Sequence, residues 1–206
     1  MKLRYMPCTT RHLLLLTFLT GILVLAGCAS DDTPEPNEPE FYIKFKAGGT
    51  EIKYDMLPNS LASFAYLDSF GFYLCTITGM KQGSDGKRDF ISMQLRNETQ
   101  YTPNTVYRLQ DPIQIQSSNQ ARIIFTYFDG NGKGYNATLL QSNYPSLSIH
   151  ENVEIKFTEM SSDYVKGTFS AEAYEVDFTV LGNRKEILIT DGEFLLPRFD
   201  DVSYTR

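Results

Sequence analysis

The feature that most restricts the fold of this chain is a period-two alternation of apolar and polar residues, which recurs from residue 41 almost to the C-terminus. Phe41, Ile43 and Phe45 fall on one face of a strand, and Gly48-Gly49 then supplies the positive φ angles that a tight hairpin turn requires. Alternation broken at close intervals by turn residues is typical of strands that pair with their sequence neighbours. It predicts an all-β fold: a single antiparallel β-sandwich or barrel-like domain of about ten strands. The pattern is compatible with either architecture.

The predicted strands lie between clusters of Gly, Asn, Asp and Ser. They cover 41–46, 50–54, 71–80, 89–96, 121–128, 135–141, 153–160, 164–176, 186–190 and 193–196, with short strands at 105–109 and 113–116. Asp191-Gly192 separates the strands at 186–190 and 193–196, and such a pair is typical of a hairpin turn. Residues 60–68 are the one segment for which a helix is expected.

The first 27 residues have the three parts of a secretory signal peptide. Lys2, Arg4 and Arg11 form a positive region, and an apolar segment covers 13–26. The segment closes with Leu25-Ala26-Gly27-Cys28, which resembles the lipobox of bacterial lipoproteins. The apolar stretch is shorter than the ~20 residues of a membrane span, and no positive stop-transfer cluster follows it. The sequence therefore predicts a lipoprotein whose membrane contact is made by acyl chains on Cys28.

Residues 28–40 are acidic and rich in proline, a composition typical of an extended spacer. Asp31 and Asp32 resemble the surface-export signal of Bacteroidetes lipoproteins. The predicted organisation is a signal peptide at 1–27, a lipidated cysteine and tether at 28–40, and a β-domain at 41–206. The expected location is the outer membrane with the domain on the cell surface; a domain facing the periplasm is the alternative.

Charge and residue counts narrow the functions. Removal of the signal leaves 16 Lys and Arg against 25 Asp and Glu, a net charge of −9 that disfavours binding to nucleic acid phosphates. The mature chain keeps one histidine, His150, expected to be exposed, which excludes multi-histidine metal sites. Cys75 is the only cysteine of the domain, so no intrachain disulfide forms there, and a buried, inert thiol is expected. No cofactor is predicted.

Six segments of the domain carry turn glycines or alternating apolar residues. They are Lys46-Ala47-Gly48-Gly49-Thr50, Ile91-Ser92-Met93-Gln94-Leu95, Thr105-Val106-Tyr107-Arg108-Leu109, Val153-Glu154-Ile155-Lys156-Phe157-Thr158, Val165-Lys166-Gly167-Thr168-Phe169-Ser170 and Ile189-Thr190-Asp191-Gly192-Glu193-Phe194. In this order they resemble the motifs of an uncharacterised family of Bacteroidetes lipoproteins. The resemblance covers 41–199 and departs at Asn104-Thr105, where the family usually has Gly-Thr. It implies a β-rich sandwich or barrel with no agreed activity.

Two acidic clusters are candidates for chemistry. Glu175 and Asp177 share a strand face about 7 Å apart, within the range of a carboxylate pair for glycoside hydrolysis, while Glu172 falls on the opposite face. A solvated, charged sheet edge is the favoured interpretation. Residues 129–134 alternate Asp, Asn and Lys with glycine, as in a calcium loop, but Lys133 stands where an oxygen ligand belongs, and a hairpin turn is favoured.

Tyrosine supplies the candidate binding residues. Tyr101, Tyr107, Tyr127, Tyr135 and Tyr144 could form a platform that stacks on sugars or on a partner protein. For any single tyrosine, a place in the core is the better prediction. The sequence favours a non-catalytic binding or interaction module for a glycan or for an envelope or host protein. The alternatives are a calycin-like barrel around a small apolar ligand and, less favoured, a hydrolase using Glu175 and Asp177.

Overall fold

Strands make up most of the computed structural model, which describes residues 40–55, 60–176 and 184–204. The strands are β1 (Tyr42–Ala47), β2 (Thr50–Asp55), β3 (Leu61–Leu67), β4 (Phe72–Met80), β5 (Phe90–Asn97), β6 (Val106–Arg108), β7 (Ile113–Ile115), β8 (Ser118–Gln120), β9 (Ile123–Phe128), β10 (Gly134–Ala137), β11 (Asn152–Met160), β12 (Tyr164–Glu175) and β13 (Glu186–Asp200). One 3-10 helix, η1, covers Gln141–Asn143, and the described residues contain no α-helix. The predicted all-β fold is confirmed.

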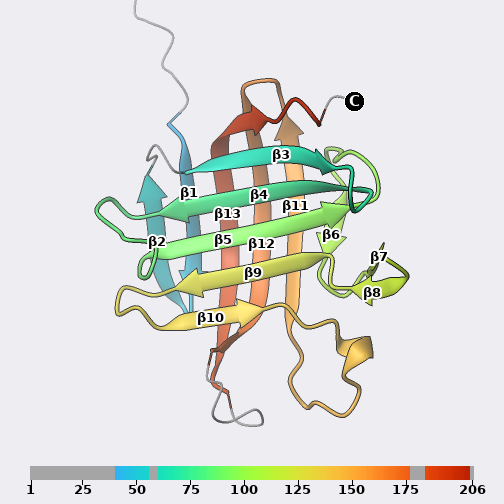
Figure 1. The fold of residues 1–206 in the computed structure, drawn as a ribbon. Helices are drawn as coiled ribbons and strands as arrows, with labels where there is room; N and C mark the ends of the chain where they lie inside the picture. Colours follow the sequence, from blue (N-terminus) through green and yellow to red (C-terminus); the bar gives the residue numbers. More distant parts are fainter. Residues whose placement is uncertain (1–39, 56–59, 177–183, 205–206) are drawn as a thin grey trace, which may run out of the picture. The chain divides into compact units, whose positions relative to one another are not determined.

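The strands form two layers that cross at a steep angle (Figure 1). The front sheet consists of β3, β4, β5, β9 and β10, and the back sheet has the order β2-β1-β13-β12-β11-β6. The small β7–β8 hairpin stands apart from both.

The two sheets are joined at both ends of the front sheet. The last residues of β13 pair with β3, and β10 pairs with the end of β12 through Tyr135↔Glu175 and Asn136↔Tyr174. Hydrogen-bonded pairing therefore runs in a closed ring through β13, β3, β4, β5, β9, β10, β12 and back to β13. The fold combines the two predicted architectures, because it is a two-layered sandwich whose layers join into a barrel-like ring. The β13–β3 pairing is parallel, unlike the antiparallel order that the sequence predicts, and it is the only parallel pair among the described strands.

Aromatic rings fill the space between the layers. Phe157 of the back sheet lies 6.0 Å from Phe64 of the front sheet, centroid to centroid, and 5.8 Å from Tyr101. Phe194 packs 6.0 Å from Phe157 and crosses Gly167, where a Cβ atom would lie only 2.4 Å from the Phe194 ring. The alternation supplies these inward residues, and burying each ring contributes on the order of 2 kcal/mol.

The predicted helix at 60–68 is wrong, because this segment forms β3 and pairs with β4 along its whole length. Its composition of Leu, Ala, Ser, Phe and Tyr suits a helix, but Ala62 and Phe64 alternate with half-buried residues and face the core. Burial of Phe64 against the back sheet outweighs the local preference.

The predicted turn at Asp191-Gly192 is also wrong, because β13 continues through it as one strand. β1 aligns Lys44 with Glu193 but Lys46 with Thr190, so β13 carries one extra residue at this point. Asp191 has a φ of 53°, and the strand forms a β-bulge. The core-facing residues of β13 consequently have odd numbers before the bulge, as at Ile189, and even numbers after it, as at Phe194.

Candidate functional site

The predicted tyrosine platform does not form on the surface, because three of its five members are buried in the core. Tyr107 and Tyr127 are core residues with 4% and 2% of their surface exposed, and Tyr101 is equally buried. The Tyr107 hydroxyl accepts a hydrogen bond from the Thr102 amide at 3.0 Å. Tyr144, 47% exposed, follows η1 on a loop. Tyr107 and Tyr127 therefore lie in the core, the place that the sequence favoured for any single tyrosine, and neither is available as a surface binding residue.

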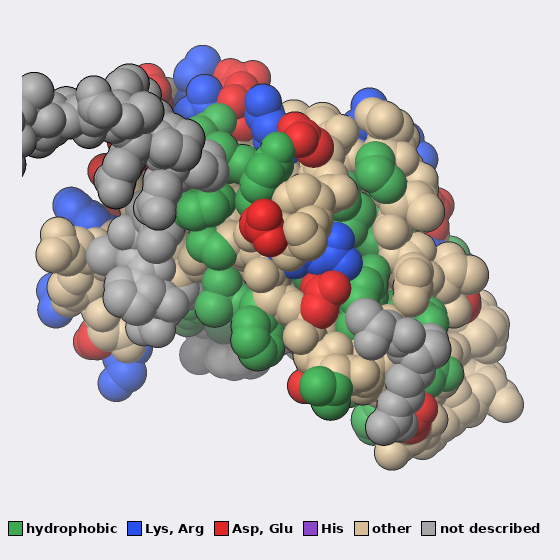
Figure 2. Space-filling view, turned by 90° about the horizontal axis from the view of Figure 1, so that it is seen from above, with side chains coloured by type: hydrophobic (Ala, Val, Ile, Leu, Met, Phe, Trp, Pro, Cys, Tyr) green, Lys and Arg blue, Asp and Glu red, His purple; other side chains and the backbone are tan. Residues whose placement is uncertain are grey.

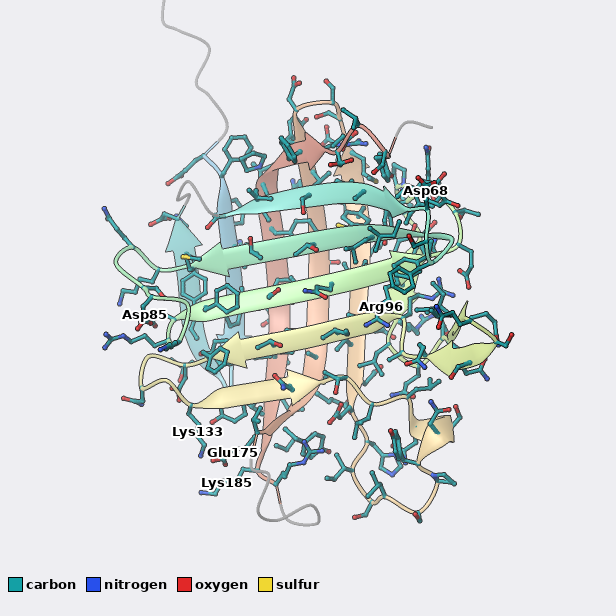
Figure 3. The ribbon with its side chains drawn as sticks, in the orientation of Figure 1. Asp68, Asp85, Arg96, Lys133, Glu175 and Lys185 are labelled. Atoms are coloured by element: carbon teal, nitrogen blue, oxygen red, sulfur yellow. The ribbon has the colours of Figure 1, made fainter. Side chains whose placement is uncertain are left out.

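Glu175 lies at the corner where β12 meets β10. Its carboxylate is 2.8 Å from the Lys133 ammonium, and this contact raises the pKa of Lys133. Lys133 also lies over the ring of Tyr135, which stacks on Tyr127 at 6.0 Å. Figure 3 shows Lys133, Glu175 and Lys185 gathered at this corner. Asp177, the proposed second carboxylate, lies outside the described residues, and Glu175 is engaged in an ion pair.

The 129–134 loop is a closed hairpin turn, as the sequence favoured. One Asp129 carboxylate oxygen accepts hydrogen bonds from the backbone amides of Asn131 and Lys133, at 2.8 and 2.9 Å. Gly132 takes a φ of 82°. Asp129 therefore satisfies the backbone of its own turn.

Cys75 and His150 lie where the sequence places them. Cys75 is fully buried in β4, and burial raises the pKa of its thiol well above the ordinary value. His150 is exposed. Within residues 40–55, 60–176 and 184–204, no three His, Cys, Asp or Glu side chains are grouped so as to hold a metal ion.

A concave surface lies on the outer face of the back sheet. It is a hollow of about 440 Å³ across β6, β11, β12 and β13, which we call the back-face hollow. Its volume falls within the range of small-molecule sites. The lining residues are Val106, Glu154, Ile155, Lys156, Thr168, Phe169, Ser170, Asp191, Gly192 and Glu193.

Two smaller hollows adjoin it. One, of about 230 Å³, shares Asp191 and Glu193 with it and extends over β1 to Lys44 and Lys46. The other, of about 210 Å³, shares Ser170 and extends toward Leu188. The three hollows thus lie next to one another on the back sheet.

Small outward residues explain why the surface is hollowed here. Thr168 and Ser170 are successive outward residues of β12, set between the longer side chains of β11 and β13. The bulge turns both Thr190 and Asp191 outward, so one acidic side chain is added at the rim. The sequence signal for this site is the alternation of Thr168 and Ser170 together with Asp191-Gly192, whereas the sequence prediction rested on tyrosines.

Each carboxylate around the back-face hollow is paired with a lysine or an arginine. Glu193 lies 3.0 Å from Lys44, and Asp191 lies 2.9 Å from Lys46. Glu154 lies 2.7 Å from Arg108. The carboxylates raise the pKa of Lys44 and Lys46 through hydrogen bonding.

A separate ion pair, between Glu151 and Arg184, has a structural role. Glu151 is almost fully buried, lies 3.3 Å from Arg184, and accepts a 2.7 Å hydrogen bond from the Leu139 amide. The pair ties the loop after β10 to the start of β13.

No protein-family model, curated protein or solved structure matches this chain. None of the described residues belongs to a helix that is long and apolar enough to span a membrane.

Proposed function

We propose that this chain is a lipid-anchored, non-catalytic binding module of the outer membrane, which binds a glycan in the back-face hollow. The anchor rests on the lipobox-like Leu25-Ala26-Gly27-Cys28, and orientation toward the cell surface rests on Asp31 and Asp32.

The observation that carries the proposal is the chemistry of the hollow. Thr168 and Ser170 present hydroxyl groups, and ammonium and carboxylate groups stand on both sides. Glu154, Asp191 and Glu193 already have cationic partners. A surface of alternating donors and acceptors with balanced charge suits the hydroxyl groups of a neutral sugar chain better than it suits a highly charged ligand.

The contacts of the acidic groups support binding rather than hydrolysis. A glycosidase keeps one carboxylic acid protonated to act as general acid. Each acid at the hollow faces a lysine or an arginine, and Glu175 faces Lys133. The aromatic packing between the layers likewise supports an external site over a barrel that encloses a small apolar ligand.

The test compares two tryptophan substitutions in the full-length protein. Thr168→Trp fills the back-face hollow, whereas Thr126→Trp places the same ring on the outer face of the front sheet. Glycans prepared from the envelope and from host surfaces are titrated against both variants. We expect Thr168→Trp to lower the affinity about tenfold or more and Thr126→Trp to leave it unchanged. Equal affinity for all three proteins, or hydrolysis of the glycan, would contradict the proposal.

A separate experiment tests the anchor. Incorporation of labelled palmitate should occur in the natural chain and disappear in Cys28→Ala. Proteinase K added to intact cells should cut the domain while a periplasmic control protein survives. Protection of the domain until the outer membrane is broken would mean that it faces the periplasm.

A further inference from the structure

The outer face of the front sheet differs from the rest of the surface in having almost no charge. Its outward positions alternate with the buried core positions of β3, β4, β5, β9 and β10. Most of them are small polar or apolar residues, among them Leu74, Thr76, Ser92, Gln94, Ile124 and Thr126. Among the outward positions of these described strands, Arg96 is the only charged residue.

Arg96 has no carboxylate partner within the described part of the chain. Leu74 lies beside Arg96 on β4. The backbone amide of Arg96 donates a hydrogen bond to the Arg122 carbonyl. The nearest acid along the strand, Glu98, is already 3.0 Å from Arg122. Partial burial lowers the pKa of Arg96, and the group that opposes this effect is the Tyr101 phenol rather than a carboxylate. Figure 3 shows Arg96 near the end of β5.

This combination is characteristic of a protein interface. The centres of such interfaces are depleted in charged residues and enriched in arginine, which is frequently a residue of high binding energy. Five strands at the usual spacing make a face of roughly 20 by 25 Å, the order of one side of a standard interface. A desolvated guanidinium gains most from a carboxylate, with which it forms two parallel hydrogen bonds.

A second copy of this chain is a poor occupant in the symmetric arrangement that most dimers adopt. A two-fold interface uses the same surface on both subunits. It would bring two faces together that carry one Arg96 each and no carboxylate between them. The missing carboxylate must then come from a different molecule.

We propose that the outer face of the front sheet docks a second protein, whose own surface is largely uncharged and which places an Asp or Glu side chain on Arg96. The surface lies on the opposite layer from the back-face hollow, and the inference does not depend on glycan binding. The partner is distinguished by its chemistry: apolar and small polar residues against Leu74 and Ile124, and one acidic residue at the position of Arg96.

The test uses a photo-crosslinking amino acid at Gln94, an exposed residue two positions from Arg96 on the same face, in the full-length chain in cells of its natural host. The matched control carries the same amino acid at Thr168 on the back sheet. We expect a protein adduct of defined mass from Gln94 and not from Thr168. Arg96→Glu should lower its yield about tenfold, and Arg96→Lys should lower it less.

The captured protein is then identified, and its acidic residues are replaced by Arg one at a time. Restored crosslinking when one of these replacements is combined with Arg96→Glu supports the proposal, because the charges have been exchanged. The proposal is overturned by absence of an adduct from a correctly folded protein, or by an adduct of twice the chain's mass. It is also overturned by a glycan or lipid adduct, or by a protein adduct that does not depend on Arg96. Melting curves of Arg96→Glu and Arg96→Lys show whether each variant is folded.

Discussion

The two outer faces of this molecule share one core yet differ sharply in chemistry. The outer face of the back sheet carries several ion pairs, among them Lys44 with Glu193 and Arg108 with Glu154. The front sheet exposes threonines, serines and apolar residues around the single charge of Arg96. Paired charges keep a surface hydrated and its edges unreactive, whereas an uncharged face loses little on being covered. The two layers therefore offer different chemistry to their surroundings.

A third surface belongs to neither face. The end of β13 and the residues after it lie at the top of Figure 1, where Phe199 and Val202 are strongly exposed. Figure 2 shows hydrophobic side chains on this end of the molecule with a few charged ones among them. Arg198 is fixed there by Asp200, 2.7 Å away, and lies 5.0 Å above the Phe64 ring. These contacts anchor the junction between β13 and β3 that closes the ring.

The largest effect is expected from Gly167→Phe, which would break the comparison by disrupting the back sheet. A Cβ atom at this position would lie 2.4 Å from the backbone oxygen of Lys156 and 2.4 Å from the Phe194 ring, so a large side chain has no room. Overpacking of this kind forces the backbone to shift. We expect the variant to be unfolded at 37 °C by circular dichroism. The control, Thr168→Phe, places the same side chain at the next residue, which points outward, and should fold.

The second-largest effect is expected from a substitution in the core, which tests whether the front and back sheets unfold together. Phe157→Ala removes a ring that contacts both layers, and should lower the free energy of unfolding by about 3–5 kcal/mol. Phe199→Ala changes an aromatic residue that is 62% exposed, and should have a small effect. Calorimetry should give a single transition for both variants. Two separate transitions in Phe157→Ala would mean that the sheets unfold independently.

The sequence predicted the inward side of this fold better than the outward side. Alternation places Phe45, Ile91 and Phe157 in the core, because burial of apolar residues at every second position is what forms a sheet face. It could not decide β9, where Ile123, Ile124, Phe125, Tyr127 and Phe128 leave both faces apolar. Tyr127 consequently looked available for binding although it shares the parity of Phe125 and is buried.

The features that position the candidate site depend on distant parts of the chain. The bulge at Asp191 is visible only when β13 is aligned with β1 and β12 at once. The ring closes through β13 and β3, which are far apart in the sequence and parallel. A local Asp-Gly pair suits a turn and a bulge equally well, so its sequence alone predicted the commoner one. Arg96 resembles any charged residue on a strand until its neighbours show that it has no partner.

A third prediction concerns ionic strength, which should affect ligand binding at the two faces differently. Raising the ionic strength from about 0.15 M to 1 M shortens the Debye length from about 8 Å to 3 Å and weakens exposed charge pairs. Binding of a neutral glycan at the back-face hollow should change little, whereas docking of a carboxylate on Arg96 should weaken several-fold. Titrations of the two ligands at both salt concentrations measure this. A strong salt dependence at the hollow would indicate a charged ligand there.

The smallest effect is expected when either of two arginines is replaced by leucine. The change in thermal stability should have opposite signs for Arg96 and Arg108. Arg96→Leu removes a partly buried charge that has no carboxylate partner, and the leucine can pack beside Leu74. The free protein should therefore become slightly more stable to heat. Arg108→Leu breaks the 2.7 Å pair with Glu154 and should make it slightly less stable. Melting temperatures of the two variants, measured side by side with the unchanged protein, test the prediction. A loss of stability in Arg96→Leu would mean that Arg96 stabilises the fold, and the front face would then need no partner to explain its lone charge.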